Sequence, residues 1–201
     1  MTTTDEQLDD SVTRDEALVE RARGGSGAAF AALVARYREG AYAIAKNMCA
    51  TPRDVEDVLQ QAFLSAWREV GSFPAGARFT TWLYRIAMNT ALEHRQRHRR
   101  RPSLSLEAFL PAFDREGRPV VSQGRWSEID GESPEPFEIT GLLREALECI
   151  DDRVRAAFVL RDLVQLLAEE AAAILQTSPQ AVLLDAHRAR LMLRGFILSQ
   201  G

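Results

Sequence analysis

Apolar side chains recur every three or four residues along most of the chain, and this spacing is typical of amphipathic helices. The clearest case begins at Val55 and ends at Val70, with apolar residues at i, i+3, i+4, i+7, i+8, i+11 and i+15. Thr51 and Pro52, with Asp54 three residues after the threonine, form a strong start signal for this helix. The pattern predicts an amphipathic helix of about 20 residues that ends near Gly71.

The same periodicity predicts helices along the rest of the chain. In the first half they cover residues 15–23, residues 27–49, and a segment that is capped by Thr80 or Thr81 and runs towards Arg101. In the second half, two helices lie within residues 139–164, and a helix–turn–helix follows them. Ser178 caps the last helix, with Pro179 at its first position. Because no segment reads as a strand, the predicted fold class is all-α.

The composition changes sharply between the two helical parts. Residues 102–138 hold five prolines and eight acids against three arginines, which predicts a flexible acidic linker. Residues 1–14 read as a disordered acidic tail. We therefore expect two small helical domains, over residues 15–101 and 139–201, joined by this linker. How the two domains sit relative to each other is left open by the sequence.

Composition also narrows the class of protein. The chain is 46% hydrophobic and 27% charged with a net charge of −4, which suits a globular protein and not one that coats nucleic acid indiscriminately. No apolar run has the length of a membrane helix, and the acidic N-terminus is not a signal peptide. Cys49 and Cys149 read as reduced thiols, so we expect a cytoplasmic protein without membrane insertion. No cluster typical of an enzyme, a cofactor or a metal site is found.

Positive charge is concentrated in one segment. Residues 78–101 hold seven arginines against a single acid, Glu93, and the segment opens with Phe79, Trp82 and Tyr84. Aromatic rings beside dense positive charge are what a protein needs to stack exposed bases while it holds phosphates. The alternative is an arginine-rich helix end in solvent, with the aromatic rings in the core.

Two motifs carry a resemblance to a known family. DVEDVLQQAFLSAW and the following FTTWLYRIAMNTALEHRQRHRRRP resemble region 2 of bacterial sigma factors of the extracytoplasmic-function (ECF) group. LLREALECIDDRVRAAFVLRDL and AHRARLMLR resemble region 4 of the same group. The resemblance implies a dissociable subunit that binds core RNA polymerase, recognises promoter DNA at two elements and helps to open the duplex. In the family, an acidic linker threads through the polymerase channels; a plain solvated tether is the alternative here.

The resemblance implies two sets of site residues in the first domain. The expected polymerase-binding face comprises Asp54, Glu56, Asp57, Gln60, Gln61 and Arg68. Acids in a first helical turn can also simply complement the helix dipole. The expected contacts to the −10 element and the upstream duplex are Arg78, Phe79, Trp82, Arg85, Asn89, Arg95, Arg97, Arg99, Arg100 and Arg101. Trp82, Arg85 and Asn89 fall on one helical stripe, and core packing is the alternative for Trp82.

The second domain departs from the family pattern. Family members usually have glycine where Gln165 and Gln176 stand, and serine in place of Leu167. A lysine–serine–arginine run is usual where this chain has Leu183, Leu184 and Asp185. The remaining candidates for −35 contacts are Ser178, Gln180, His187, Arg188 and Arg190. Two leucines cannot donate hydrogen bonds, Asp185 would repel phosphates, and the leucines, if exposed, suggest a protein partner such as an anti-sigma factor.

Three functions are therefore compatible with the sequence. An alternative sigma factor explains both motifs and their order. A sigma-like decoy or adaptor, which binds an anti-sigma factor or core polymerase without initiating, is favoured by the altered last helix. A helix–turn–helix repressor leaves residues 51–101 unexplained.

Overall fold

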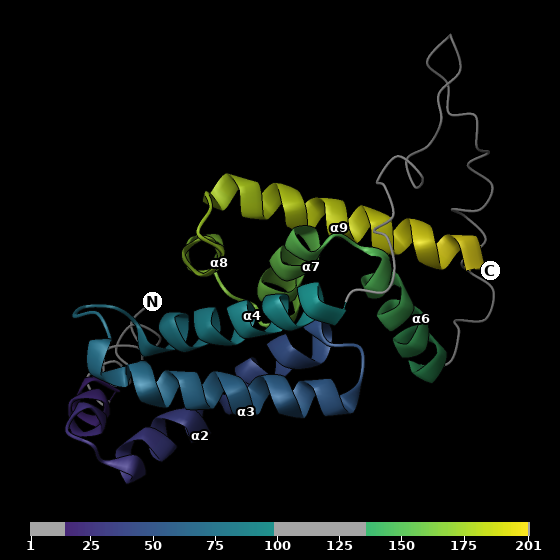
Figure 1. Ribbon diagram of the computed structural model, residues 1–201. Coiled ribbons are helices and arrows are strands. Elements are labelled where there is room, and N and C mark those ends of the chain that lie inside the picture. Colours follow the sequence, from purple (N-terminus) through teal and green to yellow (C-terminus); the bar gives the residue numbers. More distant parts are fainter. Residues whose placement is uncertain (1–14, 99–135, 201) are drawn as a thin grey trace.

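The computed structural model describes residues 15–98 and 136–200 of the chain, and all regular secondary structure in these two ranges is helical (Figure 1). The predicted all-α fold class is therefore confirmed. The predicted acidic tail, most of the predicted linker and Arg99 to Arg101 lie outside the described residues.

The first range contains a helix over residues 15–23 followed by α2 (Gly27–Met48), α3 (Pro52–Glu69), the short 3₁₀ helix η1 (Val70–Ser72) and α4 (Phe79–His98). Local capping sets the first boundaries. Gly25 has φ +87° in the turn before α2, and the Ser26 hydroxyl then accepts a hydrogen bond from the Ala29 N–H. Thr51 and Asp54 form the predicted capping box at the start of α3.

The start of α4 differs from the prediction. The helix begins at Phe79, and the carbonyl of Arg78 accepts the first hydrogen bond, from the Trp82 N–H, at 3.2 Å. Thr80 and Thr81 therefore lie inside the first turn and do not cap it. Threonine is a common N-cap residue, and for that reason the sequence pointed to Thr80 or Thr81. The backbone turn Pro74–Ala77, with Gly76 at φ +74°, instead lets the helix begin one or two residues before these threonines.

The second range contains α6 (Pro136–Cys149), α7 (Asp152–Phe158), the π-helical segment η4 (Val159–Leu163), α8 (Ala168–Leu175) and α9 (Pro179–Gln200). The helix α6 begins three residues before the predicted boundary at 139, because a proline is favourable at the first helical position. As predicted, Ser178 caps α9, and its hydroxyl accepts a hydrogen bond from the Ala181 N–H at 3.2 Å.

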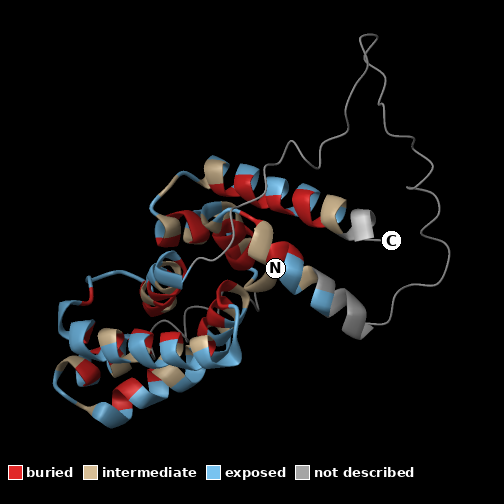
Figure 2. Ribbon diagram, turned by 45° about the vertical axis from the view of Figure 1, so that its right-hand side comes forward, coloured by how far each residue is buried: buried red, intermediate tan, exposed pale blue. Residues whose placement is uncertain are grey.

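The two ranges pack against each other through one continuous apolar core. Leu83 and Met88 of α4 belong to the same buried cluster as Leu160 of η4 and Ile174 of α8. In Figure 1, α4 lies between α2 and α3 on one side and α7 and α8 on the other. Figure 2 shows the buried residues gathered along the faces that these helices turn towards each other. A smaller cluster, which includes Leu147 and Leu193, joins α6 to α9.

Candidate nucleic-acid and polymerase-binding surfaces

The aromatic residues at the start of α4 are in the core. Trp82 is 5% exposed, and its ring makes an edge-to-face contact with Phe73 at 5.4 Å between ring centroids. Phe79 packs against Trp82 at 5.5 Å and against Tyr37 at 5.9 Å. In this conformation the core-packing alternative for Trp82 holds, and neither Trp82 nor Phe79 can stack on a base. The aromatic cluster instead packs the loop after η1, through Phe73, against the start of α4.

The polar residues of α4 divide between surface and interior. Arg85 is half-buried, whereas Asn89 and Arg97 are exposed. Arg78, just before the helix, is also exposed and pairs with Glu170 of α8 at 2.8 Å. The predicted stripe of Trp82, Arg85 and Asn89 is therefore not one exposed surface, because its first member faces the core.

Arg95 was expected to hold DNA phosphates, but in this conformation it is 8% exposed and lies between the two described ranges. Its Nε lies 2.7 Å from Asp152 Oδ1, and its Nη1 lies 3.0 Å from Glu148 Oε2 and 3.0 Å from the Met48 carbonyl oxygen. Burial alone would lower the pKa of Arg95, but the hydrogen bonds and charges of Asp152 and Glu148 outweigh it and raise this pKa. The guanidinium is therefore held by two carboxylates and a backbone carbonyl.

Arg155 of α7 completes this buried charge network. Its Nη1 donates to Glu148 Oε1 at 2.9 Å and to the Leu147 carbonyl at 3.0 Å, and its Nε donates to the Asn47 carbonyl at 2.6 Å. Burial and the nearby charge of Arg95 lower the pKa of Arg155 to about 10. Both guanidiniums thus donate to the last carbonyls of α2, where the helix dipole favours positive charge.

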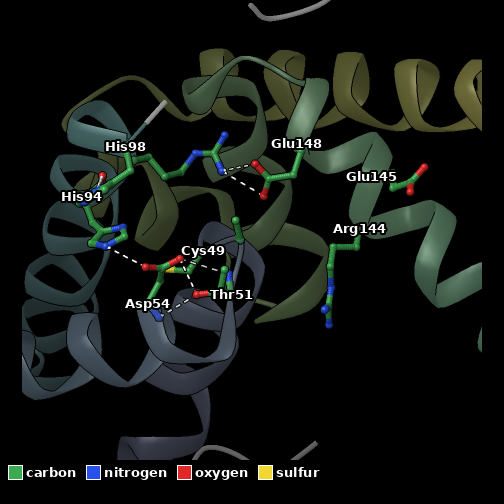
Figure 3. A pocket seen from close by; sticks show the side chains of 10 residues that line it. Cys49, Thr51, Asp54, His94, His98, Arg144, Glu145 and Glu148 are labelled. Atoms are coloured by element: carbon green, nitrogen blue, oxygen red, sulfur yellow. Dashed lines mark hydrogen bonds and ion pairs between the residues drawn. The ribbon is translucent and has the colours of Figure 1, made fainter. Parts of the chain in front are cut away.

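A pocket of about 500 Å³ opens beside this network, between the C-terminal end of α4, the start of α3 and α6 (Figure 3). The ring of His94 points at Asp54, with 3.3 Å between Nε2 and Oδ1, and stacks on His98 at 4.2 Å between centroids. Burial, with the charges of His98 and Arg97, lowers the pKa of His94 despite Asp54. No three His, Cys, Asp or Glu side chains in the described ranges gather as a metal site would require.

The predicted polymerase-binding residues of α3 form one solvent-facing surface, with one exception. Glu56, Asp57, Gln60, Gln61 and Arg68 are all exposed. Asp54 is half-buried, because it belongs to the capping box and faces His94. Burial alone would raise the pKa of Asp54, but the hydrogen bonds from Thr51 and the charge of His94 lower it. Asp54 therefore caps α3 and complements its helix dipole, which is the alternative to a polymerase contact for this residue.

Two apolar residues that the sequence analysis did not select lie on this same face. Leu64 is 47% exposed and Trp67 is 37% exposed, and they continue the row that starts with Asp57 and Gln60. The Trp67 ring packs on Phe30 at 5.1 Å, which holds it in place at the surface. The sequence already contained a signal for them, because both residues lie outside the apolar stripe of α3. A large apolar side chain at such a position faces away from the core.

The helix–turn–helix has the expected interior. Val182, Ala186, Ala189 and Leu193 of α9 are buried, as their spacing predicts. Of the candidate −35 contacts, Ser178, Gln180, His187, Arg188 and Arg190 are all exposed. Arg190 forms an ion pair with Asp162, in which its Nε and Nη2 donate hydrogen bonds to the two carboxylate oxygens at 2.8 Å and 3.2 Å.

Both glutamines that stand where the family usually has glycine adopt positive φ. Gln165 has φ +61° and Gln176 has φ +52°. This left-handed region favours glycine, because a Cβ crowds the backbone there. The chain thus keeps the backbone path of the motif without the residue that fits it best.

Asp185 does not face solvent, so the predicted repulsion of DNA phosphates is wrong for this conformation. The residue is 5% exposed, and its Oδ2 accepts a hydrogen bond from Arg153 Nε of α7 at 2.9 Å. Arg188 lies 3.5 Å from the other carboxylate oxygen. Leu183 and Leu184, in contrast, are 48% and 50% exposed, so the apolar pair that the sequence suggested is present at the surface.

Comparisons with known proteins cover most of the chain. The family model for sigma-70 region 2 matches residues 33–101. The RNA polymerase sigma-H factor of Pseudomonas aeruginosa is 32% identical over 181 residues, covering 88% of this chain and 90% of that protein. The ECF RNA polymerase sigma-E factor of Escherichia coli K12 is 35% identical over the same shares of the two chains. The chain belongs to the ECF RNA polymerase sigma factors.

Solved structures share this fold. CnrH, determined in complex with the cytosolic domain of CnrY, superposes with a TM-score of 0.64 at 25% identity, covering 94% of this chain and 99% of that one. RpoE, determined with the anti-sigma factor NepR from Bartonella quintana, gives a TM-score of 0.59 at 19% identity over 84% of this chain and 96% of that one, and supports the fold alone.

Family membership confirms the resemblance stated from the two motifs. This ECF sigma factor is a non-enzymatic protein that directs transcription initiation by RNA polymerase. Region 2, as matched, covers most of α2 together with α3 and α4, so it contains the exposed face of α3 and the polar residues of α4. No helix within residues 15–98 and 136–200 has the length and hydropathy needed to cross a membrane.

Proposed function

We propose that this sigma factor docks on core RNA polymerase through the exposed face of α3. The supporting observation is that Glu56, Asp57, Gln60 and Gln61 surround the exposed Leu64 on a helix whose opposite face is in the core. An apolar centre with a polar and charged rim is the usual composition of a protein interface. The acidic residues also favour association with a basic partner surface.

The promoter-melting surface comprises the accessible polar residues of α4 and the residues that precede and follow it. Asn89 and Arg97 are exposed, Arg85 is half-buried, and Arg78 is exposed but pairs with Glu170; these four residues contact the −10 strand and the upstream phosphates. Arg99 and Arg100, outside the described residues, extend this basic segment. Arg95 reaches a phosphate only after Glu148 and Asp152 release it, and Phe79 and Trp82 reach a base only if the aromatic cluster rearranges.

The double substitution Arg85→Ala and Asn89→Ala tests this assignment. We expect weaker promoter opening, measured by permanganate reactivity of unpaired thymines, while binding to core polymerase persists. Glu93→Ala is the matched control, because Glu93 is exposed on the same helix but carries no group that attracts DNA. Unchanged opening in the double variant would exclude Arg85 and Asn89 from the melting surface.

The second half of the proposal concerns −35 recognition and inhibition. The helix α9 is the recognition helix, with Gln180, His187 and Arg188 as its exposed polar contacts. An anti-sigma factor binds the protein and holds it inactive; RpoE, which shares the fold, was determined in complex with the anti-sigma factor NepR. Since core RNA polymerase is the partner, the protein acts in the cytoplasm.

One observation favours the decoy as a second candidate. Leu183 and Leu184 leave part of α9 without hydrogen-bond donors at positions where the family usually has them. A decoy would bind core polymerase and yield no transcript from any promoter, whereas the sigma factor that we propose initiates from its own.

A further inference from the structure

We infer that Leu183 and Leu184 are specificity residues that read the 5-methyl groups of thymines in the major groove of the −35 duplex. The inference rests on the proposed use of α9 as a recognition helix. Both leucines lie on the second turn of α9, and each is about half exposed, at 48% and 50%. The first turns of a recognition helix are the part that meets base edges.

The electrostatic surroundings of this pair suit duplex DNA. After Glu170 the chain contains a single acid, Asp185, and this residue is buried and paired with Arg153. The exposed neighbours of the leucines along α9 are Gln180 one turn before them and His187 and Arg188 one turn after them. The side chains of Arg153 and Arg188, which both pair with Asp185, are still 64% and 46% exposed, so they add positive charge near this part of α9.

The chemistry of the leucine side chain then selects the ligand. Leucine neither donates nor accepts a hydrogen bond, so it cannot distinguish guanine, cytosine or adenine by their polar edges. The thymine methyl is the apolar group that a base pair presents in the major groove. Gln180 and His187 flank the pair, and an amide such as that of Gln180 can bind adenine through its N6 and N7 atoms.

In the usual family pattern, lysine and serine stand at the positions of Leu183 and Leu184 themselves, and these two polar side chains would read different groups. This chain therefore keeps the recognition helix, its Ser178 cap and the nearby arginines. At the two central positions that face the bases, it has apolar side chains in place of polar ones. We expect a −35 element with thymine at one or two positions that the leucines cover.

The test uses holoenzyme, assembled from core polymerase and the full chain. A promoter library with a randomised −35 segment is first selected for binding, and we expect enrichment of thymine at adjacent positions. The selected thymines are then replaced one by one with deoxyuridine, which removes only the methyl group. We expect a three- to fourfold loss of promoter affinity per methyl, about the size of one buried methylene.

Variants assign the effect to the leucines. Leu183→Ala with Leu184→Ala should bind the thymine and deoxyuridine promoters equally well. Leu191→Ala is the control, since Leu191 is a less exposed leucine, at 36%, about two turns farther along α9. This control should keep the thymine preference. Because all three leucines are at the surface, the variants should fold, which circular dichroism can verify.

Three outcomes would overturn the inference, and they are distinguishable from one another. Equal affinity of wild-type holoenzyme for thymine and deoxyuridine promoters would show that the methyl groups are not read. Initiation without any enriched −35 sequence would overturn the inference and the proposed role of α9, while the proposed polymerase docking and promoter melting would stand. Absence of any specific promoter complex would overturn the proposed function together with the inference.

Discussion

Single residues of this sigma factor are best understood from the environment that the fold gives them. Asp185 and Arg95 illustrate this. Asp185 was expected to repel DNA phosphates and Arg95 to bind them. Each is instead buried and paired with an opposite charge from another helix. A buried charge is tolerated only with such partners, because desolvation is costly. The identity of each residue was visible in the sequence, whereas its partner was not.

Replacing Gln176 with glycine should stabilise the protein. Gln176 has φ +52°, where a Cβ is strained and glycine is not. We expect the free energy of unfolding to rise by about 0.5–1 kcal/mol, measured by urea denaturation. Gln60→Gly, at an exposed position inside α3, is the matched control and should lower it by about 1 kcal/mol. A loss of stability in both variants would contradict the strain at Gln176.

At the scale of helices, patterns local in the chain were predictive. The capping box of α3, the cap of α9 and the buried stripe of α9 follow from residues within a few positions of each other. The start of α4 was not predicted, because a loop turn, and not a side-chain cap, sets it. Leu64 falls off the apolar stripe of α3, so its exposure could have been predicted from the sequence as well.

The exposed face of α3 leads to a prediction about polymerase binding. Leu64→Ala should weaken binding to core polymerase about tenfold, which corresponds to roughly 1.4 kcal/mol, because it removes the apolar centre of the face. Binding can be measured by fluorescence anisotropy with labelled sigma factor. Tyr42→Ala is the control, since Tyr42 is equally exposed, at 49%, but lies on α2. Equal affinities of wild type and Leu64→Ala for core polymerase would show that the docking surface does not include Leu64.

At the scale of the whole molecule, the contact between the two described ranges is the feature that sequence reasoning left open. Arg95 meets Glu148 and Asp152, which are 53 and 57 residues away in the chain. Local periodicity carries no information about such pairs. This contact bears on function, because Glu148 and Asp152 pair with Arg95, which belongs to the basic segment that we propose binds DNA. While it is paired in this way, Arg95 cannot contact a phosphate. The domain boundaries drawn from the sequence stay a prediction.

Removing these carboxylate charges should loosen the contact. We predict that Glu148→Gln with Asp152→Asn, in a Cys149→Ser background, makes Cys49 react faster with iodoacetamide. Burial raises the pKa of the Cys49 thiol to about 11, and this residue lines the pocket between the ranges, so the packed arrangement suppresses its reactivity. Glu145→Gln is the control, because Glu145 lines the same pocket but is exposed. Equal rates in all three proteins would exclude the network as the element that holds the ranges together.

The most direct test of the account is run-off transcription with purified core polymerase, this protein and the promoter region of its own gene. We predict a discrete transcript that depends on the protein and is weakened by Arg85→Ala with Asn89→Ala. Binding to core polymerase without a transcript, from this template and from a broad promoter pool, would contradict the account and identify the protein as a decoy.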